Sequence, residues 1–150
     1  MQTNPLIRPY SKKDQVLVLQ ILQLNTPLFF APNEYEDFKS YLETSIEDYY
    51  ILELNQQIIG AGGINYQVQE QTATISWDLL HPDFQRQGFG SHLLQHRLRV
   101  IKENDEIKQV IVRTSQIAYP FYQKHGFSLE YAKVNYWAPG YDLYYMSQEL

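Results

Sequence analysis

A strand, a glycine-containing loop and a helix follow one another in the middle of the chain, and this succession constrains the fold most. The residues from Thr72 to Leu80 read as a strand. Pro82 ends that strand because proline cannot continue a hydrogen-bonded ladder. Gly88 and Gly90 then precede the clearest amphipathic helix, Ser91 to Glu103. The chain must therefore turn from a sheet into a helix at this point.

Periodicity and turn residues predict further elements on both sides of this segment. The apolar run Val110–Val112 is typical of a buried central strand. Glycines at 60, 62 and 63 weaken the strand that contains them and indicate close packing or a β-bulge. The other predicted elements are a strand at Leu6–Arg8, a helix from Ser11–Asp14 to about Asn25, a helix capped by Asn33, strands at Tyr49–Leu54, Ile58–Ile64 and Lys108–Thr114, a helix at Ile117–His125, and strands at Phe127–Trp137 and Tyr141–Glu149. The order predicts a mixed α/β (α+β) fold around a central sheet.

Composition excludes several classes of protein. The formal net charge is −5 at pH 7 and the basic residues are scattered, which argues against a nucleic-acid binder. There is no cysteine, so disulfides, thiolate nucleophiles and cysteine-ligated zinc are excluded, and a cytoplasmic location is expected. The residues Met1–Pro5 do not resemble the start of a signal peptide, and no apolar run is long enough for a membrane span. The length fits one domain, residues 1–150.

The loop before the long helix has the properties of an anion site. The first N–H groups of a helix lack partners inside the helix, and the helix dipole favours negative charge there. Gly88 and Gly90 have no side chain that would keep a phosphate away from the backbone. The alternative is an ordinary strand-to-helix turn that uses glycine for its torsions. A P-loop is excluded because no Gly-Lys-Ser/Thr occurs, and the dinucleotide motif fails because Leu93 takes the third glycine position.

Two motifs resemble those of the GNAT superfamily of acetyl-CoA-dependent N-acetyltransferases. The run Gln85–Gly90 matches the pattern Q/R-x-x-G-x-G/A, which in that family holds the pyrophosphate of coenzyme A. The stretch Thr114–Phe127, which ends in Tyr-x-x-x-Gly-Phe, is similar to the second motif of the family. The order of elements over essentially the whole chain also matches. The resemblance implies a GNAT-type fold with a mostly antiparallel, splayed central sheet flanked by helices.

The same resemblance implies a binding site for acetyl-CoA as co-substrate, without a metal. The strand before the loop would offer its backbone to the pantetheine arm and the thioester, and the N–H groups of the loop would hold the pyrophosphate. Ser115 takes the place of an asparagine that often contacts the pantetheine in the family. The implied cofactor-binding residues are Leu79, Leu80, Gln85, Arg86, Gln87, Gly88, Phe89, Gly90, Ser91 and Ser115.

Tyr122 occupies the position of the family's general acid, which protonates the leaving thiolate. A phenol, with a pKa of about 10, carries its proton at neutral pH, as an acid must. The general base is less clearly marked, because Thr74 and Ile111 stand where a glutamate is expected. Asp78 is the candidate base on the strand; His81 and a chain of water molecules are the alternatives.

The implied reaction transfers an acetyl group to a primary amine of a small molecule by direct attack. A protein or peptide amine, and a non-catalytic acyl-CoA-binding module on the same fold, stay open as alternatives. No membrane partner is expected, and a homodimer stays open because the last strand is exposed. His92 and His96 lie four residues apart, but the sequence favours a solvated helix face over a metal site. The acids Glu34, Glu36 and Asp37 favour a helix N-terminus more than an amine-binding surface.

Overall fold

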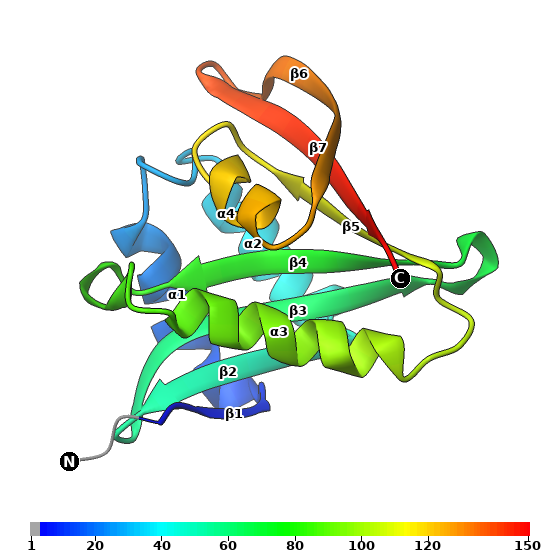
Figure 1. Ribbon diagram of the computed structural model, residues 1–150. Helices are drawn as coiled ribbons and strands as arrows, with labels where there is room; N and C mark the ends of the chain where they lie inside the picture. The colour runs from blue at the N-terminus through cyan, green and yellow to red at the C-terminus, as the bar shows by residue number, and fades with distance from the viewer. Residues whose placement is uncertain (1–3) are drawn as a thin grey trace.

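A seven-stranded sheet forms the centre of the computed structural model, which describes residues 4–150 (Figure 1). The strand order is β1-β2-β3-β4-β5-β7-β6, and among these neighbours β4 and β5 run parallel while the other pairs are antiparallel. The predicted mixed α/β fold is thereby confirmed. Residues 1–3 lie outside the described residues; they belong to the segment Met1–Pro5, which does not resemble the start of a signal peptide. The strands are β1 (Leu6–Pro9), β2 (Asp48–Leu54), β3 (Gln57–Gln67), β4 (Thr72–Leu80), β5 (Gln109–Thr114), β6 (Ser128–Ala138) and β7 (Tyr141–Glu149).

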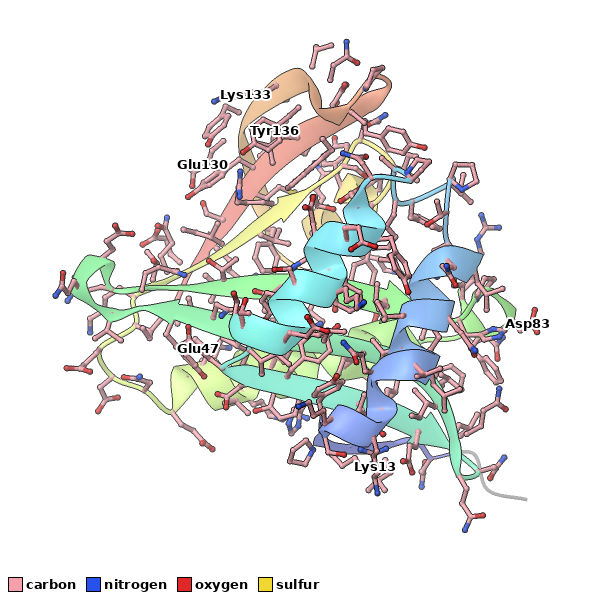
Figure 2. All side chains as sticks on the ribbon, turned by 180° about the vertical axis from the view of Figure 1, so that it is seen from behind. Lys13, Glu47, Asp83, Glu130, Lys133 and Tyr136 are labelled. Atoms are coloured by element: carbon pink, nitrogen blue, oxygen red, sulfur yellow. The ribbon has the colours of Figure 1, made fainter. Side chains whose placement is uncertain are left out.

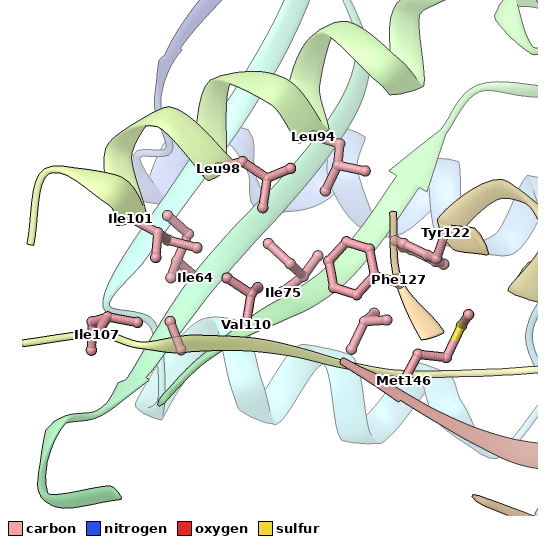
Figure 3. Packing of buried hydrophobic residues seen from close by; sticks show 12 residues of the cluster. Ile64, Ile75, Leu94, Leu98, Ile101, Ile107, Val110, Tyr122, Phe127 and Met146 are labelled. Atoms are coloured by element: carbon pink, nitrogen blue, oxygen red, sulfur yellow. The ribbon is translucent and has the colours of Figure 1, made fainter. Parts of the chain in front are cut away.

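Helices cover both faces of the sheet. The helices α1 (Gln15–Leu24) and α2 (Glu34–Thr44) lie on one face, which Figure 2 shows from the front. The helices α3 (Phe89–Lys102) and α4 (Tyr119–Lys124) lie on the other, toward the viewer in Figure 1. Each face has its own apolar cluster. Leu94, Leu98 and Ile101 of α3 pack on Ile64 and Ile75 (Figure 3), and Val18, Leu22, Phe38, Ile51 and Leu79 pack on the opposite face.

Several helix ends differ from the predicted ones. The helix α3 begins at Phe89, two residues before the predicted start. The helix α4 begins at Tyr119, because the side chain of Ser115 accepts hydrogen bonds from the N–H groups of residues 117 and 118 and holds a turn there. Asn33 does not cap α2 with its side chain, which donates to the carbonyl of Trp137 at 3.3 Å. The buried carboxylate of Glu34 accepts from the N–H of residue 31 at 2.8 Å and caps this turn.

The parallel strands β4 and β5 stay paired over only part of their length. Hydrogen-bonded register runs from Thr72 opposite Gln109 to Ile75 opposite Val112 and then stops. Beyond that point the two strands diverge, and α4 lies on the side where they separate (Figure 1). The outer half of β4 therefore has backbone groups that β5 does not use.

A β-bulge at the same place reverses the direction of the side chains on β4. Ala61 pairs with Leu79 and Gly63 pairs with Ser76, so two residues of β4 lie opposite Gly62 alone. Trp77 is one of the two, and its φ of 48° is unusual for a bulky side chain. Without the bulge, alternation would place residues 77 and 79 on the α3 face with Ile75. With it, Trp77 and Leu79 pack on the opposite face, and the side chain of Asp78 lies on the α3 face. The close packing expected at the glycines of β3 is confirmed, since a Cβ on Gly62 would lie 2.5 Å from Oδ1 of Asp78, whereas the extra residue of this bulge lies on β4.

None of the helices within residues 4–150 is long and apolar enough to cross a membrane.

Candidate active site

Asp78, Tyr122 and Arg97 form a hydrogen-bonded constellation where β4 and β5 diverge. The hydroxyl of Tyr122 on α4 donates to Oδ2 of Asp78 at 2.5 Å. The guanidinium of Arg97 on α3 donates through Nη2 to the other carboxylate oxygen, Oδ1. The carboxylate is 23% exposed, whereas the arginine side chain has no exposed surface. The structure thus brings the predicted acid and the candidate base into direct contact, with a cation behind them.

Tyr122 is neutral in this arrangement. Only 4% of the residue is exposed, and its ring lies at one end of the apolar cluster between α3 and the sheet (Figure 3). Burial, together with the carboxylate of Asp78, raises the pKa of Tyr122 well above its usual value of 10.0, and Arg97 opposes this only in part. The phenol therefore carries its proton at every physiological pH.

Arg97 is a site residue that the sequence analysis missed. It lies on the buried face of α3, beside Leu93, Leu94, Leu98 and Ile101. An arginine on that stripe, three residues from Leu94 and four from Ile101, is the signal that could have revealed it, because a buried cation needs an acceptor.

The loop between β4 and α3 presents free backbone donors. Within residues 4–150, no N–H group from Arg86 to Ser91 donates a hydrogen bond to another part of the chain. Gly88 has a φ of 89°, and a Cβ built on it would meet nothing within 4 Å. The side chains of Arg86 and Gln87 are exposed, and Nε2 of Gln87 donates back to the carbonyl of Asp83. Free donors, open space and the N-terminus of α3 together fit a phosphate group.

Hydrogen bonds of Gln85 and Asn25 connect this loop to the end of β4. Nε2 of Gln85 donates to the carbonyl of Leu80 at 3.0 Å and to Oδ1 of Asn25 at 2.9 Å. Nδ2 of the buried Asn25 donates to the same carbonyl at 3.0 Å. Gln85 therefore serves to position the loop, and Asn25, which follows α1, is a second residue that the sequence analysis missed.

The backbone of Leu80 points toward the gap between β4 and β5. The N–H of His81 donates to the carbonyl of Ile59 on β3 at 2.7 Å. In an antiparallel pair the neighbouring residue then directs both backbone groups away from the partner strand. The N–H of Leu80 therefore faces the side on which β5 has separated, where it can donate to a bound group. Leu79 pairs with Ala61 of β3 and is buried against the α1–α2 face, so its side chain does not reach the gap.

The family comparison covers this whole region. A family model described as the acetyltransferase (GNAT) family matches residues 17–127, which include β4, the loop, α3 and Tyr122. The chain belongs to the GNAT family of acetyltransferases. The resemblance drawn from the sequence motifs is thereby confirmed, and the chain is an acyltransferase. A search of curated protein sequences finds no match.

Solved GNAT structures share the fold at low sequence identity. An acetyltransferase described as a GNAT family member from Desulfovibrio desulfuricans has a TM-score of 0.81 at 19% identity, over 97% of this chain and 99% of its own. The ribosomal-protein-S18-alanine N-acetyltransferase from Escherichia coli has a TM-score of 0.80 at 18% identity, over 97% and 94%. A GNAT family acetyltransferase from Elizabethkingia anophelis, solved with acetyl-CoA bound, has a TM-score of 0.75 at 20% identity, over 99% and 100%. These likenesses show a shared fold and leave the acceptor open.

The other candidates of the GNAT site have ordinary structural partners. Ser115 is buried and holds the turn before α4, as described above. Nδ1 of His81 accepts from the N–H of Asp83 at 3.1 Å, and His81 borders a surface hollow between α1 and the β2–β3 turn, which Asp78 does not line. His92 is exposed and His96 packs on Tyr50. Within residues 4–150 there is no group of three or more His, Cys, Asp or Glu side chains that could hold a metal ion.

His125 joins the start of α3 to the end of α4. Its Nε2 lies 2.8 Å from Oγ of Ser91, which lies in the first turn of α3. Burial, and to a smaller extent the charge of Lys124, lowers the pKa of His125 from 6.5. The unfolded chain therefore binds this proton at a higher pH than the folded chain does. By linkage, the stabilisation is complete above pH 6.5 and is lost as the pH falls below it.

We expect the melting temperature to fall as the pH is lowered from 7 toward 5, and the fall to be smaller in His125→Gln, which keeps a hydrogen-bonding group next to Ser91. The measurement is thermal unfolding at a series of pH values and constant ionic strength. His92→Gln, an exposed histidine of α3, is the matched control and should follow the wild type. Equal pH dependence in His125→Gln and the wild type would contradict the assignment.

Proposed function

We propose that residues 1–150 form one acetyl-CoA-dependent N-acetyltransferase domain that acetylates a primary amine of a small molecule by direct attack. The observation that carries this proposal is the contact between Tyr122 and Asp78 at the point where β4 leaves β5. The GNAT neighbour solved with acetyl-CoA, and an aminoglycoside 6'-N-acetyltransferase solved with coenzyme A, support acetyl-CoA as co-substrate.

The proposed cofactor site extends from the anion loop to the outer half of β4. The free N–H groups from Arg86 to Ser91 would hold the pyrophosphate, with the exposed guanidinium of Arg86 adding positive charge. The backbone of Leu79 and Leu80 and the turn at Ser115 would border the pantetheine arm. The N–H of Leu80 would donate to the thioester oxygen as negative charge develops on it.

Asp78 and Tyr122 are proposed to move one proton as a unit. If Tyr122 gave its proton to the thiolate while Asp78 was ionised, two adjacent anions would be left in a largely buried place. The amine must first lose one proton to solvent, because an ammonium nitrogen has no lone pair. Asp78 then avoids the second anion by accepting a proton from the neutral nitrogen as it attacks. It then returns a proton to the oxygen of Tyr122 as the phenol protonates the sulfur. One proton has then moved from nitrogen to sulfur, the N–C bond has formed, the C–S bond has broken, and both side chains are restored.

The acceptor is proposed to be a small cationic amine. The chain carries a net charge of −5, which favours the approach of cations. The Escherichia coli neighbour is named for a ribosomal protein and the coenzyme A-bound neighbour for an aminoglycoside, so both acceptor classes occur on this fold. A protein amine and a non-catalytic acyl-CoA-binding role are the alternatives. A cytoplasmic location fits the cysteine-free sequence. The expectation that the last strand is exposed is wrong, because β7 lies between β5 and β6; the exposed edge strand is β6, and it leaves room for a homodimer.

Thermal unfolding with and without acetyl-CoA tests the cofactor first. A ligand at 100 times its Kd stabilises the folded state by about 2.7 kcal/mol, so a clear rise in melting temperature is expected. Adenosine, which lacks the pyrophosphate and the pantetheine arm, is the control and should cause no shift. If the shift appears, release of free thiol in the presence of candidate amines measures turnover. No shift at millimolar acetyl-CoA would rule out the proposed function.

A further inference from the structure

Arg97 is fully buried, and each of its three side-chain nitrogen atoms donates a hydrogen bond. Nε donates to the carbonyl of Leu93 at 3.3 Å, Nη1 donates to the carbonyl of Gly63 at 3.2 Å, and Nη2 donates to Oδ1 of Asp78. The guanidinium is therefore fixed by α3 on one side and by β3 on the other. A rigid planar group held in this way can fix the orientation of a carboxylate.

The strand β3 leaves room for this ion pair. A Cβ built on Gly62 would lie 2.5 Å from Oδ1 of Asp78 and 2.7 Å from Nη1 of Arg97. The bulge on β4 supplies the other half of the arrangement, because it turns Asp78 toward α3. The missing side chain at Gly62 and the bulge on β4 together leave the space that the ion pair occupies.

Stability alone does not account for such a pair. Buried ion pairs can often be replaced by apolar side chains of similar volume with no loss of stability, because removing both charges from water is costly. Here the carboxylate keeps some exposure and uses its second oxygen, Oδ2, to accept from Tyr122. The arginine therefore acts on the one carboxylate that contacts the phenol.

We propose that Arg97 is a positioning residue for acetyl transfer: it holds Asp78 through Oδ1, so that Oδ2 stays directed at the hydroxyl of Tyr122 and the two residues exchange a proton. This inference rests on the proposed function. Arg97 itself does not reach the substrates, because it has no exposed surface. Its effect on turnover must pass through Asp78.

The test is a double-mutant cycle on kcat with Arg97→Met, Asp78→Asn and the double variant. We expect Asp78→Asn to lower kcat about 100-fold, as the loss of a proton-transfer group does. Arg97→Met should lower kcat about 10-fold or more, because a misplaced carboxylate transfers the proton poorly. If Arg97 acts through Asp78, the double variant is no slower than Asp78→Asn. Independent effects would multiply to about 1,000-fold.

Binding of acetyl-CoA separates this inference from the proposed function. The Kd for acetyl-CoA is measured by titration of the wild type and of each variant without an acceptor amine. In Arg97→Met this Kd should stay within about twofold of the wild-type value, because the loop between β4 and α3 is not altered. Arg99→Met, on the exposed face of α3, is the matched control and should keep wild-type kcat. If Arg97→Met does not fold, Arg97→Lys, which keeps the charge but not the fork of donors, takes its place in the cycle.

A wild type that neither binds acetyl-CoA nor releases thiol would overturn the proposed function. A wild type that turns over, with kcat unchanged in the folded Arg97 variant, would overturn the inference and leave the function standing. Multiplicative effects in the double variant would also overturn it, because Arg97 would then act on stability or packing alone.

Discussion

Replacing Tyr122 with phenylalanine is expected to lower kcat about 1,000-fold, within the range that loss of a general acid produces. The phenyl ring keeps the packing against Phe121 and Phe127, so the fold is retained. The variant loses the hydroxyl that donates to Asp78 and that is proposed to protonate the leaving sulfur. A thiol has a pKa of about 8.5, so the thiolate can leave slowly without the phenol, and a residual rate is expected.

Steady-state release of free thiol measures this effect, and titration with acetyl-CoA shows whether binding is retained. Tyr119→Phe is the matched control on the same helix, where the ring packs on Tyr144. It should keep wild-type turnover. A Tyr122→Phe variant with wild-type kcat would show that the phenol carries no proton in the rate-limiting step.

Replacing Gly62 with alanine is expected to lower the free energy of unfolding by about 3 kcal/mol, since the new methyl group overlaps the buried ion pair. The Cβ would lie 2.9 Å from Cζ of Arg97, and the guanidinium is held on both sides and has little freedom to move away. Either Arg97 or Asp78 must shift, and one charge then loses its partner. The carboxylate also turns away from Tyr122, so kcat falls together with stability.

Urea unfolding without ligand measures the change, and Gly90→Ala is the control. At residue 90 an added Cβ would lie 3.6 Å from the ring of Phe121, an ordinary contact, and alanine is a better helix former than glycine. The control should be as stable as the wild type or slightly more stable. A Gly62→Ala variant with wild-type stability would mean that the bulge on β4 relaxes without cost.

The fold could be predicted from the sequence because its elements have strong local signals. The apolar strand β5 and the amphipathic helix α3 lie within one or two residues of their predicted bounds, and Gly88 lies in the loop before α3 as predicted. The pairing of Tyr122 with Asp78 could not be predicted, because it depends on the bulge at Trp77. Regular alternation would have placed residue 78 on the other face of the sheet.

Arg97 and Asn25 were missed for a related reason. Both are buried polar residues whose partners lie far away in the sequence: Arg97 contacts Asp78, and Asn25 contacts Leu80 and Gln85. A polar residue on an apolar stripe signals that a partner exists, but not which one. The prediction that the side chain of Asn33 caps α2 is wrong, because this side chain donates to the distant carbonyl of Trp137 and makes no capping hydrogen bond at the start of the helix.

The bulge divides β4 into two parts that have different neighbours. The inner part, up to Ile75, is paired on both edges and belongs to the core, so its residues must satisfy packing on all sides. Beyond Trp77 the strand no longer pairs with β5, and its side chains make a different set of contacts. Substitutions in the inner part are therefore expected to act mainly on stability, and substitutions in the outer part mainly on the groups next to Asp78.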